Sequence, residues 1–258
     1  MFRVYGQKPC GVVVIHGGPC APGEMKGVAE QLQHIDGVLE PFLIQDSLEK
    51  QCAYLEHLIT ENCHVPTCIV GWSWGAMFGY LFAARRPSLV KKLILVSSGV
   101  FDSKYAASIQ GTRMARLKGE DKKIFSRLSS QLKDPECKEK DERLQELARL
   151  FNKIDSYDPI STQEGHKSCS YELFSKVWQE TAQLRSSGEL LQMGTKISCP
   201  VVSIHGDYDP HPIEGIERPL SSVLKDFSFT VLPHCGHRPW MEREARDQFL
   251  YILQKEIC

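Results

Sequence analysis

A pentapeptide with one serine between two glycines constrains this chain more than any other feature. Gly71-Trp72-Ser73-Trp74-Gly75 matches the G-x-S-x-G pattern, in which the serine lies on a strained turn between a strand and a helix. The apolar run 67–70 before it is typical of a short buried strand, and the residues from Ala76 onward are typical of a buried helix. Such a turn leaves no room for side chains two positions before and after the serine, and the two glycines meet that need. We therefore expect the serine hydroxyl to be exposed at a helix N-terminus, which favours negative charge.

Strand and helix patterns alternate on both sides of this turn. The β-branched run 11–15 is typical of a strand covered on both faces of a parallel sheet. Further strands are expected at 38–42, 92–99, 201–205 and 227–232, and helices at 24–33, 48–62, 216–225 and 244–256. The pattern predicts an α/β fold with a mostly parallel central sheet and helices on both faces.

The pattern changes at about residue 101. From there to 194 the chain is rich in charge, has few β-branched runs and shows helical periodicity, with breaks near Tyr157-Asp158-Pro159 and Ser187-Gly188. We expect three or four helices, inserted as a lid. The predicted organisation is a core domain formed by 1–100 and 195–258 and a helical cap formed by 101–194.

Composition excludes several kinds of partner. In 258 residues, 31 Lys and Arg balance 32 Asp and Glu, and a formal charge of −1 gives no general attraction to nucleic acid or to an anionic membrane. No apolar run approaches the roughly 18 residues that span a bilayer. The ten cysteines are scattered, without a CxxC pair or a metal-site spacing, which favours reduced thiols, a cytoplasmic location and no metal. A monomer or homodimer without a cofactor is expected.

Two later loops supply the groups that a serine nucleophile needs. Serine requires a base within hydrogen-bond reach, and the base requires an acid that orients it. Asp209 follows the strand 201–205, and His237 follows the strand 227–232, so both belong at the carboxyl edge of the sheet. Asp207 is the weaker candidate for the acid and is expected to cap its loop, and His234 is expected to be structural.

At these residues the chain resembles the α/β-hydrolase superfamily. The elbow 71–75, the G-x-x-D stretch 206–209 and the G-H pair 236–237 all look like motifs of that family. The resemblance implies an α/β-hydrolase fold with Ser73 as nucleophile, Asp209 as acid and His237 as general base. It also implies an oxyanion hole formed by two backbone N–H groups, those of Trp74 and of Gly18, with Gly17 as the alternative to Gly18.

The loop His16-Gly17-Gly18-Pro19 looks like the HGGPG of the proline iminopeptidase subgroup. Cys20 stands where that subgroup has its last glycine, and its D-Q-R-G-x-G-x-S stretch is absent, with 42–47 in its place. These departures weaken the aminopeptidase interpretation. A binder of a free amino terminus would also need an acid facing Ser73, for which Glu172, Glu180 and Glu189 are available.

Substrate choice is expected to depend on residues beside the elbow and on the helical insert. Gly17, Trp72 and Trp178 are the candidate substrate-binding residues, although core packing would also explain the two tryptophans. The first hypothesis is a serine hydrolase that cleaves a small carboxylic ester or related acyl compound through an acyl-enzyme. The alternatives are a proline-iminopeptidase-like aminopeptidase and a small-ligand receptor that turns over slowly or not at all.

Overall fold

A computed structural model describes residues 1–19, 21–161 and 169–258 of the chain. Its centre is a seven-stranded sheet in the order β1-β3-β2-β4-β5-β6-β7. The strands are β1 (Phe2–Tyr5), β2 (Cys10–Ile15), β3 (Val38–Pro41), β4 (Cys63–Trp72), β5 (Val90–Val96), β6 (Val201–Gly206) and β7 (Phe227–Leu232). Neighbouring strands are parallel throughout, except that β1 pairs antiparallel with β3 at one edge. The predicted α/β class with a mostly parallel sheet is confirmed.

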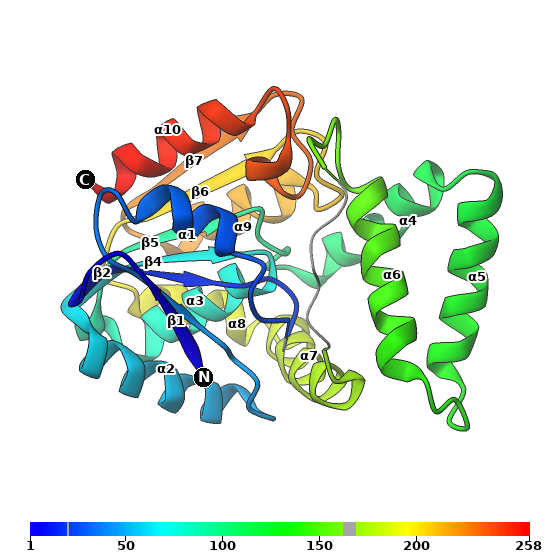
Figure 1. Ribbon diagram of the computed structural model, residues 1–258, viewed down its shortest axis with the longest axis horizontal. Coiled ribbons are helices and arrows are strands. Elements are labelled where there is room, and N and C mark those ends of the chain that lie inside the picture. The colour runs from blue at the N-terminus through cyan, green and yellow to red at the C-terminus, as the bar shows by residue number, and fades with distance from the viewer. Residues whose placement is uncertain (20, 162–168) are drawn as a thin grey trace.

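Helices cover both faces of the sheet (Figure 1). One face carries α1 (Lys26–Leu32) and α10 (Arg246–Ile257), and the other carries α2 (Leu48–Asn62), α3 (Trp74–Arg85), α8 (Glu189–Gln192) and α9 (Glu217–Val223). Successive strand residues point to opposite faces. Along β5, Leu93 and Leu95 pack into the core on the α3 face, while Ile94 and Val96 pack into the core on the α1 face. The continuous apolar runs are therefore buried on both sides.

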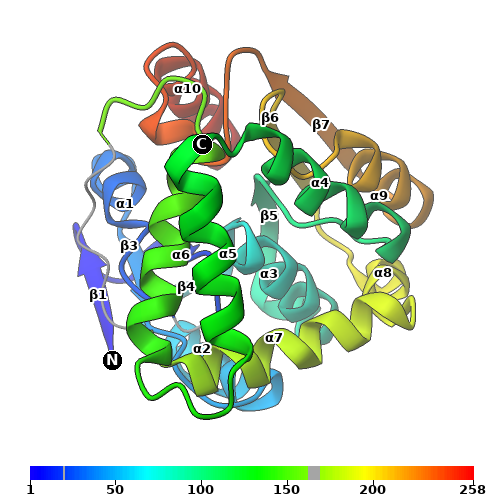
Figure 2. The ribbon, with the colours of Figure 1, turned by 90° about the vertical axis from the view of Figure 1, so that its right-hand side faces the viewer.

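The remaining long helices come from the segment between β5 and β6. They are α4 (Ala106–Arg116), α5 (Gly119–Lys133), α6 (Lys140–Ile154) and α7 (Tyr171–Ser186). In Figure 2, α5 and α6 stand in front of the sheet and α7 crosses below them. This is the segment expected to form a cap, and the break expected near Ser187-Gly188 falls between α7 and α8, where Gly188 has φ +79°.

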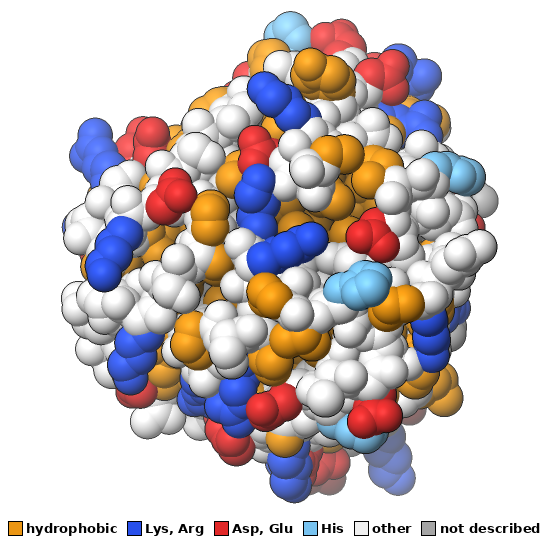
Figure 3. All heavy atoms as spheres, turned by 90° about the vertical axis from the view of Figure 1, so that its left-hand side faces the viewer, with side chains coloured by type: hydrophobic (Ala, Val, Ile, Leu, Met, Phe, Trp, Pro, Cys, Tyr) orange, Lys and Arg blue, Asp and Glu red, His pale blue; other side chains and the backbone are white. Residues whose placement is uncertain are grey.

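The surface charges, the cysteines and the apolar character of the helices can be compared with the composition of the chain. Basic and acidic side chains are interspersed on the face shown in Figure 3. Eight described cysteines carry free thiols: Cys10, Cys52, Cys63, Cys68, Cys137, Cys199, Cys235 and Cys258. No helix in the described ranges has both the length and the apolar character required to cross a membrane.

A buried carboxylate joins the chain that follows α6 to the core. Glu242 is fully buried and accepts hydrogen bonds from the backbone N–H groups of Tyr157 (2.9 Å), Asp158 (2.8 Å) and Gly236 (3.1 Å). Three donors on one carboxylate satisfy backbone groups that would otherwise be costly to bury. This contact fixes the chain after α6 against the loop that follows β7.

We predict that Glu242→Gln lowers the free energy of unfolding by about 1–3 kcal/mol, because the amide NH₂ group then faces a backbone donor. Glu244→Gln is the matched control: its carboxylate is 60% exposed in a pair with His234, and we expect a change of about 0.5 kcal/mol or less. Urea denaturation of both variants measures the difference. Equal effects would show that the buried carboxylate does not join the two segments.

Candidate active site

Ser73 lies on the strained turn that the glycine pattern predicts. Its backbone has φ +56° and ψ −119°, between the end of β4 and the first residue of α3, and its N–H donates to the Val96 carbonyl (2.9 Å). A Cβ on Gly71 would lie 2.3 Å from the Gly75 carbonyl oxygen, and a Cβ on Gly75 would lie 2.3 Å from that of His16. Both glycines are therefore required by close approach of backbone to backbone.

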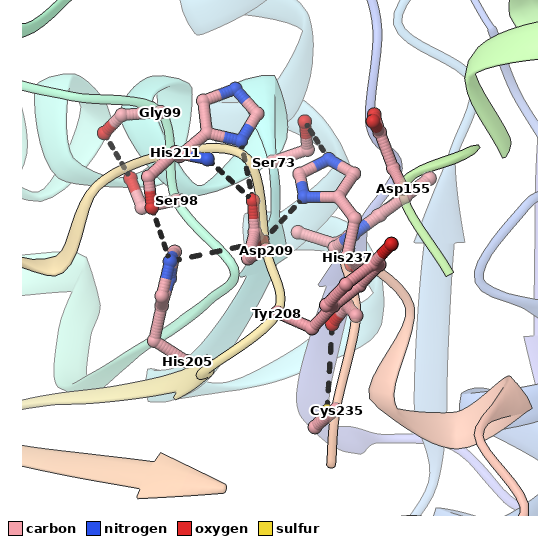
Figure 4. A network of polar contacts seen from close by, with 12 residues as sticks. Ser73, Ser98, Gly99, Asp155, His205, Tyr208, Asp209, His211, Cys235 and His237 are labelled. Carbon is pink, nitrogen blue, oxygen red and sulfur yellow. Dashed lines mark hydrogen bonds and ion pairs between the residues drawn. The ribbon is translucent and has the colours of Figure 1, made fainter. Parts of the chain in front are cut away.

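The structure brings Ser73, His237 and Asp209 into one hydrogen-bonded chain (Figure 4). His237 Nε2 is 2.9 Å from Ser73 Oγ, and its Nδ1 is 2.7 Å from Asp209 Oδ2. Since the carboxylate can only accept, Nδ1 carries the ring proton, which leaves Nε2 of the neutral imidazole free to accept from the serine hydroxyl. The three residues come from the ends of β4, β6 and β7, at the carboxyl edge of the sheet.

The Asp209 side chain is completely shielded from solvent and remains ionised. Burial by itself would raise its pKa, but the nearby His237, His205 and His211 outweigh that effect and hold the pKa of Asp209 well below its ordinary value. An ionised acid beside Nδ1 favours the imidazolium that would form when His237 takes up a proton.

His211 is a member of this cluster that sequence reasoning missed. Its backbone N–H donates to Asp209 Oδ1 (2.9 Å), its Nδ1 lies 2.7 Å from the same oxygen, and its ring stacks on that of His237 with centroids 4.8 Å apart. Burial lowers the pKa of His211 to about 4 although Asp209 opposes the shift. A histidine two residues after the acid gives no sequence signal of its own. Here it fixes the carboxylate orientation by occupying the oxygen that His237 does not use.

Contacts from two sides hold the His237 loop. Trp72 Nε1 donates to the His237 carbonyl (2.8 Å), and the Trp72 ring packs against the imidazole with centroids 5.4 Å apart. From the helical segment, the Asp155 carbonyl accepts from the His237 N–H (2.9 Å), while the Asp155 carboxylate binds Arg113 at 2.6 to 3.1 Å. The general-base candidate is thus positioned by both the core and the end of α6.

The weaker candidates have structural contacts. Asp207 accepts from the Cys235 N–H (3.1 Å) and so joins its loop to the loop that follows β7. His234 pairs with Glu244 at 2.7 Å and stacks on Tyr157.

The loop after β2 supplies Gly18 beside the serine, and its neighbours are fixed by packing. Gly18 has φ +49° and lines the same cavity as Ser73 and Trp74. As the first residue of α3, Trp74 has no helical acceptor for its N–H. His16 is fully buried, accepts from the Leu43 N–H (3.2 Å) and donates to the Gly17 carbonyl (2.9 Å), and burial lowers its pKa to about 4. His16 is therefore a neutral structural residue.

A cavity of about 620 Å³ opens over Ser73. Gly18, Trp72, Trp74 and His237 form its floor, and residues of α4, α5, α6 and α7, Trp178 among them, form its other walls. Of the three expected substrate-binding residues, Trp72 and Trp178 line the cavity.

Gly17 differs from the expectation that it binds substrate. It does not line the cavity, because its missing side chain instead makes room for the Trp72 ring, which a Cβ would approach to 2.5 Å. Glu172, Glu180 and Glu189 do not line it either, whereas Glu24, Arg113 and Arg185 do, and sequence reasoning missed these three. Cys20, which departs from the subgroup pattern, lies outside the described residues.

One group of described residues has the donor types of a metal site. Ligand atoms of Asp209, His211 and His237 lie within 4.8 Å of one another. The hydrogen bonds of both histidines to the carboxylate account for this clustering.

Comparison with known proteins shows the family. A model of the α/β hydrolase fold family matches residues 49–243, which is more than half of the chain and includes the elbow, the acid loop and the histidine loop. The chain therefore belongs to the α/β hydrolase fold family, and this membership supports a hydrolase in general terms. No curated protein matches the chain in sequence.

Solved structures of the same fold cover nearly the whole chain. A hydrolase of the α/β fold family from Bacillus anthracis str. Sterne aligns with a TM-score of 0.72 at 14% identity, covering 99% of this chain and 94% of its own. Monoacylglycerol lipase from Paleococcus ferrophilus aligns at 0.65 and 16% identity, covering 100% and 97%. Proline iminopeptidase from Mycobacterium smegmatis aligns at 0.63 and 16% identity, covering 99% and 93%. At such identities the likeness defines the fold alone.

We predict that Gly75→Ala destabilises the protein by about 3 kcal/mol, because the added methyl group meets backbone that cannot move independently. Gly111→Ala is the control, since Gly111 is exposed within α4 and a Cβ there meets nothing within 4 Å. That change should be neutral or stabilise by about 0.5 kcal/mol. Thermal unfolding compares the two, and tolerance of alanine at position 75 would contradict the close-packed turn.

Protonation of His16 should make stability depend on pH. Its pKa is about 4 in the folded chain against 6.5 when unperturbed, so the unfolded chain binds the proton first as pH falls. Folding stability is then lost progressively from pH 6.5 to 4, by up to about 3 kcal/mol from this group. Urea denaturation of wild type and His16→Gln at pH 7 and pH 4.5 isolates the contribution, because the variant lacks the proton. Identical pH dependence in the two proteins would refute it.

Proposed function

We propose that the protein is a serine hydrolase that cleaves a small carboxylic ester or related acyl compound through an acyl-enzyme intermediate. The observation that carries this proposal is the chain of hydrogen bonds from Ser73 through His237 to a buried, ionised Asp209, at the floor of a large cavity. A serine with this base and acid is activated for nucleophilic attack.

The first half-reaction forms the acyl-enzyme. His237 Nε2 takes the hydroxyl proton as Ser73 Oγ bonds to the substrate carbonyl carbon, and the carbonyl oxygen becomes an oxyanion. The N–H groups of Trp74 and Gly18 are proposed to stabilise that charge. Collapse of the intermediate breaks the bond to the alcohol, which leaves with the proton from His237.

The second half-reaction restores the enzyme. Water donates a proton to His237 Nε2 as its oxygen adds to the acyl carbon, and the resulting intermediate expels Ser73, which regains its proton. Asp209 stays ionised throughout and stabilises the transient imidazolium. The products are a carboxylic acid and an alcohol.

The helices α4 to α7 are proposed to act as a cap that selects the substrate. Their contribution to the cavity includes apolar side chains of α5, α6 and α7, such as Phe125, Phe151 and Phe174. A small-molecule acyl substrate fits these surroundings, and the eight free thiols support a cytoplasmic location. The three glutamates expected to bind an amino terminus do not line the cavity, but Glu24 does, so the proline-iminopeptidase-like aminopeptidase is kept as the second candidate function.

We predict that wild type reacts with a fluorophosphonate probe and hydrolyses p-nitrophenyl esters, whereas Ser73→Ala and His237→Ala lose labelling and about 10³-fold or more of kcat/KM. A panel of acyl lengths, with prolyl p-nitroanilide beside it, separates esterase from aminopeptidase. Ester hydrolysis that survives Ser73→Ala would overturn the proposal. A wild type that binds a ligand tightly but neither labels nor turns over would instead indicate a receptor.

A further inference from the structure

Arg185 is a cation in the wall of the cavity with no partner in the described parts of the chain. It lines the same cavity as Ser73 and His237. Its Nε is buried without a hydrogen bond, and no described carboxylate or carbonyl accepts from its guanidinium. Burial lowers the pKa of Arg185, yet an arginine stays protonated at neutral pH. The residue as a whole is half-buried, so part of the guanidinium is open to the cavity and available to a ligand, while the buried Nε is costly to leave without an acceptor.

The other arginine that lines the cavity, Arg113, is neutralised by an ion pair. Arg113, on α4, donates three hydrogen bonds to the Asp155 carboxylate, at 2.6, 2.9 and 3.1 Å. That pair is neutral as a unit and also anchors the His237 loop through the Asp155 carbonyl. Glu24 lines the cavity as well, but no ion pair joins it to Arg185 among the described residues.

Arg185 lies on the face of α7 that lines the cavity. Phe174, Trp178, Thr181 and Arg185 recur at helical spacing, and Phe174, Trp178 and Arg185 all line the cavity. Thr181 accepts a hydrogen bond from Trp74 Nε1 (3.1 Å), so this face of α7 is fixed against the residue next to Ser73. Arg185 lies one helical turn further along the same face, about 6 Å away.

We propose that Arg185 binds a carboxylate carried by the substrate, so that the enzyme acts on esters that contain a second, ionised acid group. This inference rests on the proposed hydrolase function and names its substrate class. The guanidinium presents paired donors that match the two oxygens of a carboxylate. Trp178 and Phe174, stacked with centroids 6.1 Å apart, would contact the apolar chain between the ester and the acid.

The test compares matched anionic and neutral substrates. On the acyl side these are mono-p-nitrophenyl glutarate and adipate against p-nitrophenyl pentanoate and hexanoate. On the alcohol side they are 4-acetoxybenzoate against phenyl acetate. Wild type should show a higher kcat/KM for the anionic member of one series, and that series locates the carboxylate on the acyl or the alcohol portion. Arg185→Gln should lower the anionic-to-neutral ratio by about tenfold or more, and Arg185→Lys should restore part of it.

Arg149→Gln is the matched control, because Arg149 is exposed on α6 and outside the cavity, and it should leave the ratio unchanged. A ratio that stays at the wild-type value in Arg185→Gln, in both series, would overturn the proposal. A general loss of activity from a structural defect lowers both members equally and counts against it in the same way.

Binding measurements separate this proposal from that of the hydrolase activity. In a Ser73→Ala background, titration calorimetry with monomethyl adipate and with 4-acetoxybenzoate should show at least one of them binding about tenfold or more weakly when Arg185→Gln is added. If wild type hydrolyses none of the esters while that difference is seen, the hydrolase proposal fails and the carboxylate site stands. Equal affinity for both compounds with and without the Arg185→Gln substitution would refute the proposed carboxylate site, whatever the catalytic result.

Discussion

The backbone of Ser73 is the constraint on which the site depends. A non-glycine residue at φ +56° and ψ −119° costs on the order of 1–3 kcal/mol and persists only where its surroundings leave no alternative. Here Gly71 and Gly75 let three backbone segments meet at distances that no Cβ would allow, and the Ser73 N–H continues the pairing towards β5. The strain places the hydroxyl at the cavity floor and leaves the first N–H groups of α3 directed away from any helical acceptor. A relaxed turn would lose both the position of the hydroxyl and the orientation of these N–H groups.

The two tryptophans beside Ser73 connect this turn to the rest of the site in different directions. Trp72 holds the His237 loop through its ring N–H and its packing against the imidazole, and Gly17 has no side chain because that ring occupies the space. Trp74 reaches the other way, to Thr181 on α7. The His237 loop and α7, which forms one wall of the cavity, are therefore both held in place by residues of the strained turn. These contacts join segments that are more than a hundred residues apart in the sequence.

Much of this arrangement is encoded locally. Uninterrupted β-branched runs define the parallel strands, and glycine spacing defines the turn, so the fold and the meeting of Ser73, Asp209 and His237 follow from sequence. β1 was not predicted, because its residues are half-buried at an antiparallel edge and show no continuous apolar run. His211 and Arg185 were missed for another reason. The role of His211 depends on its contacts with Asp209 and His237, which only the folded loops create, and that of Arg185 depends on its lack of a partner after packing. The periodicity of α7 places Arg185 on a face without saying what that face contacts. Gly17 shows the converse, since a glycine beside the site serves packing there.

Under the proposed mechanism, Ser73 becomes covalently acylated during turnover. Rapid quenching of wild type with a p-nitrophenyl ester in the first turnover, followed by peptide mapping by mass spectrometry, tests it directly. We expect one added acyl group on the peptide that contains Ser73, formed in step with a burst of p-nitrophenol. Product release without any covalent species, or an acyl group on a different residue, would contradict it.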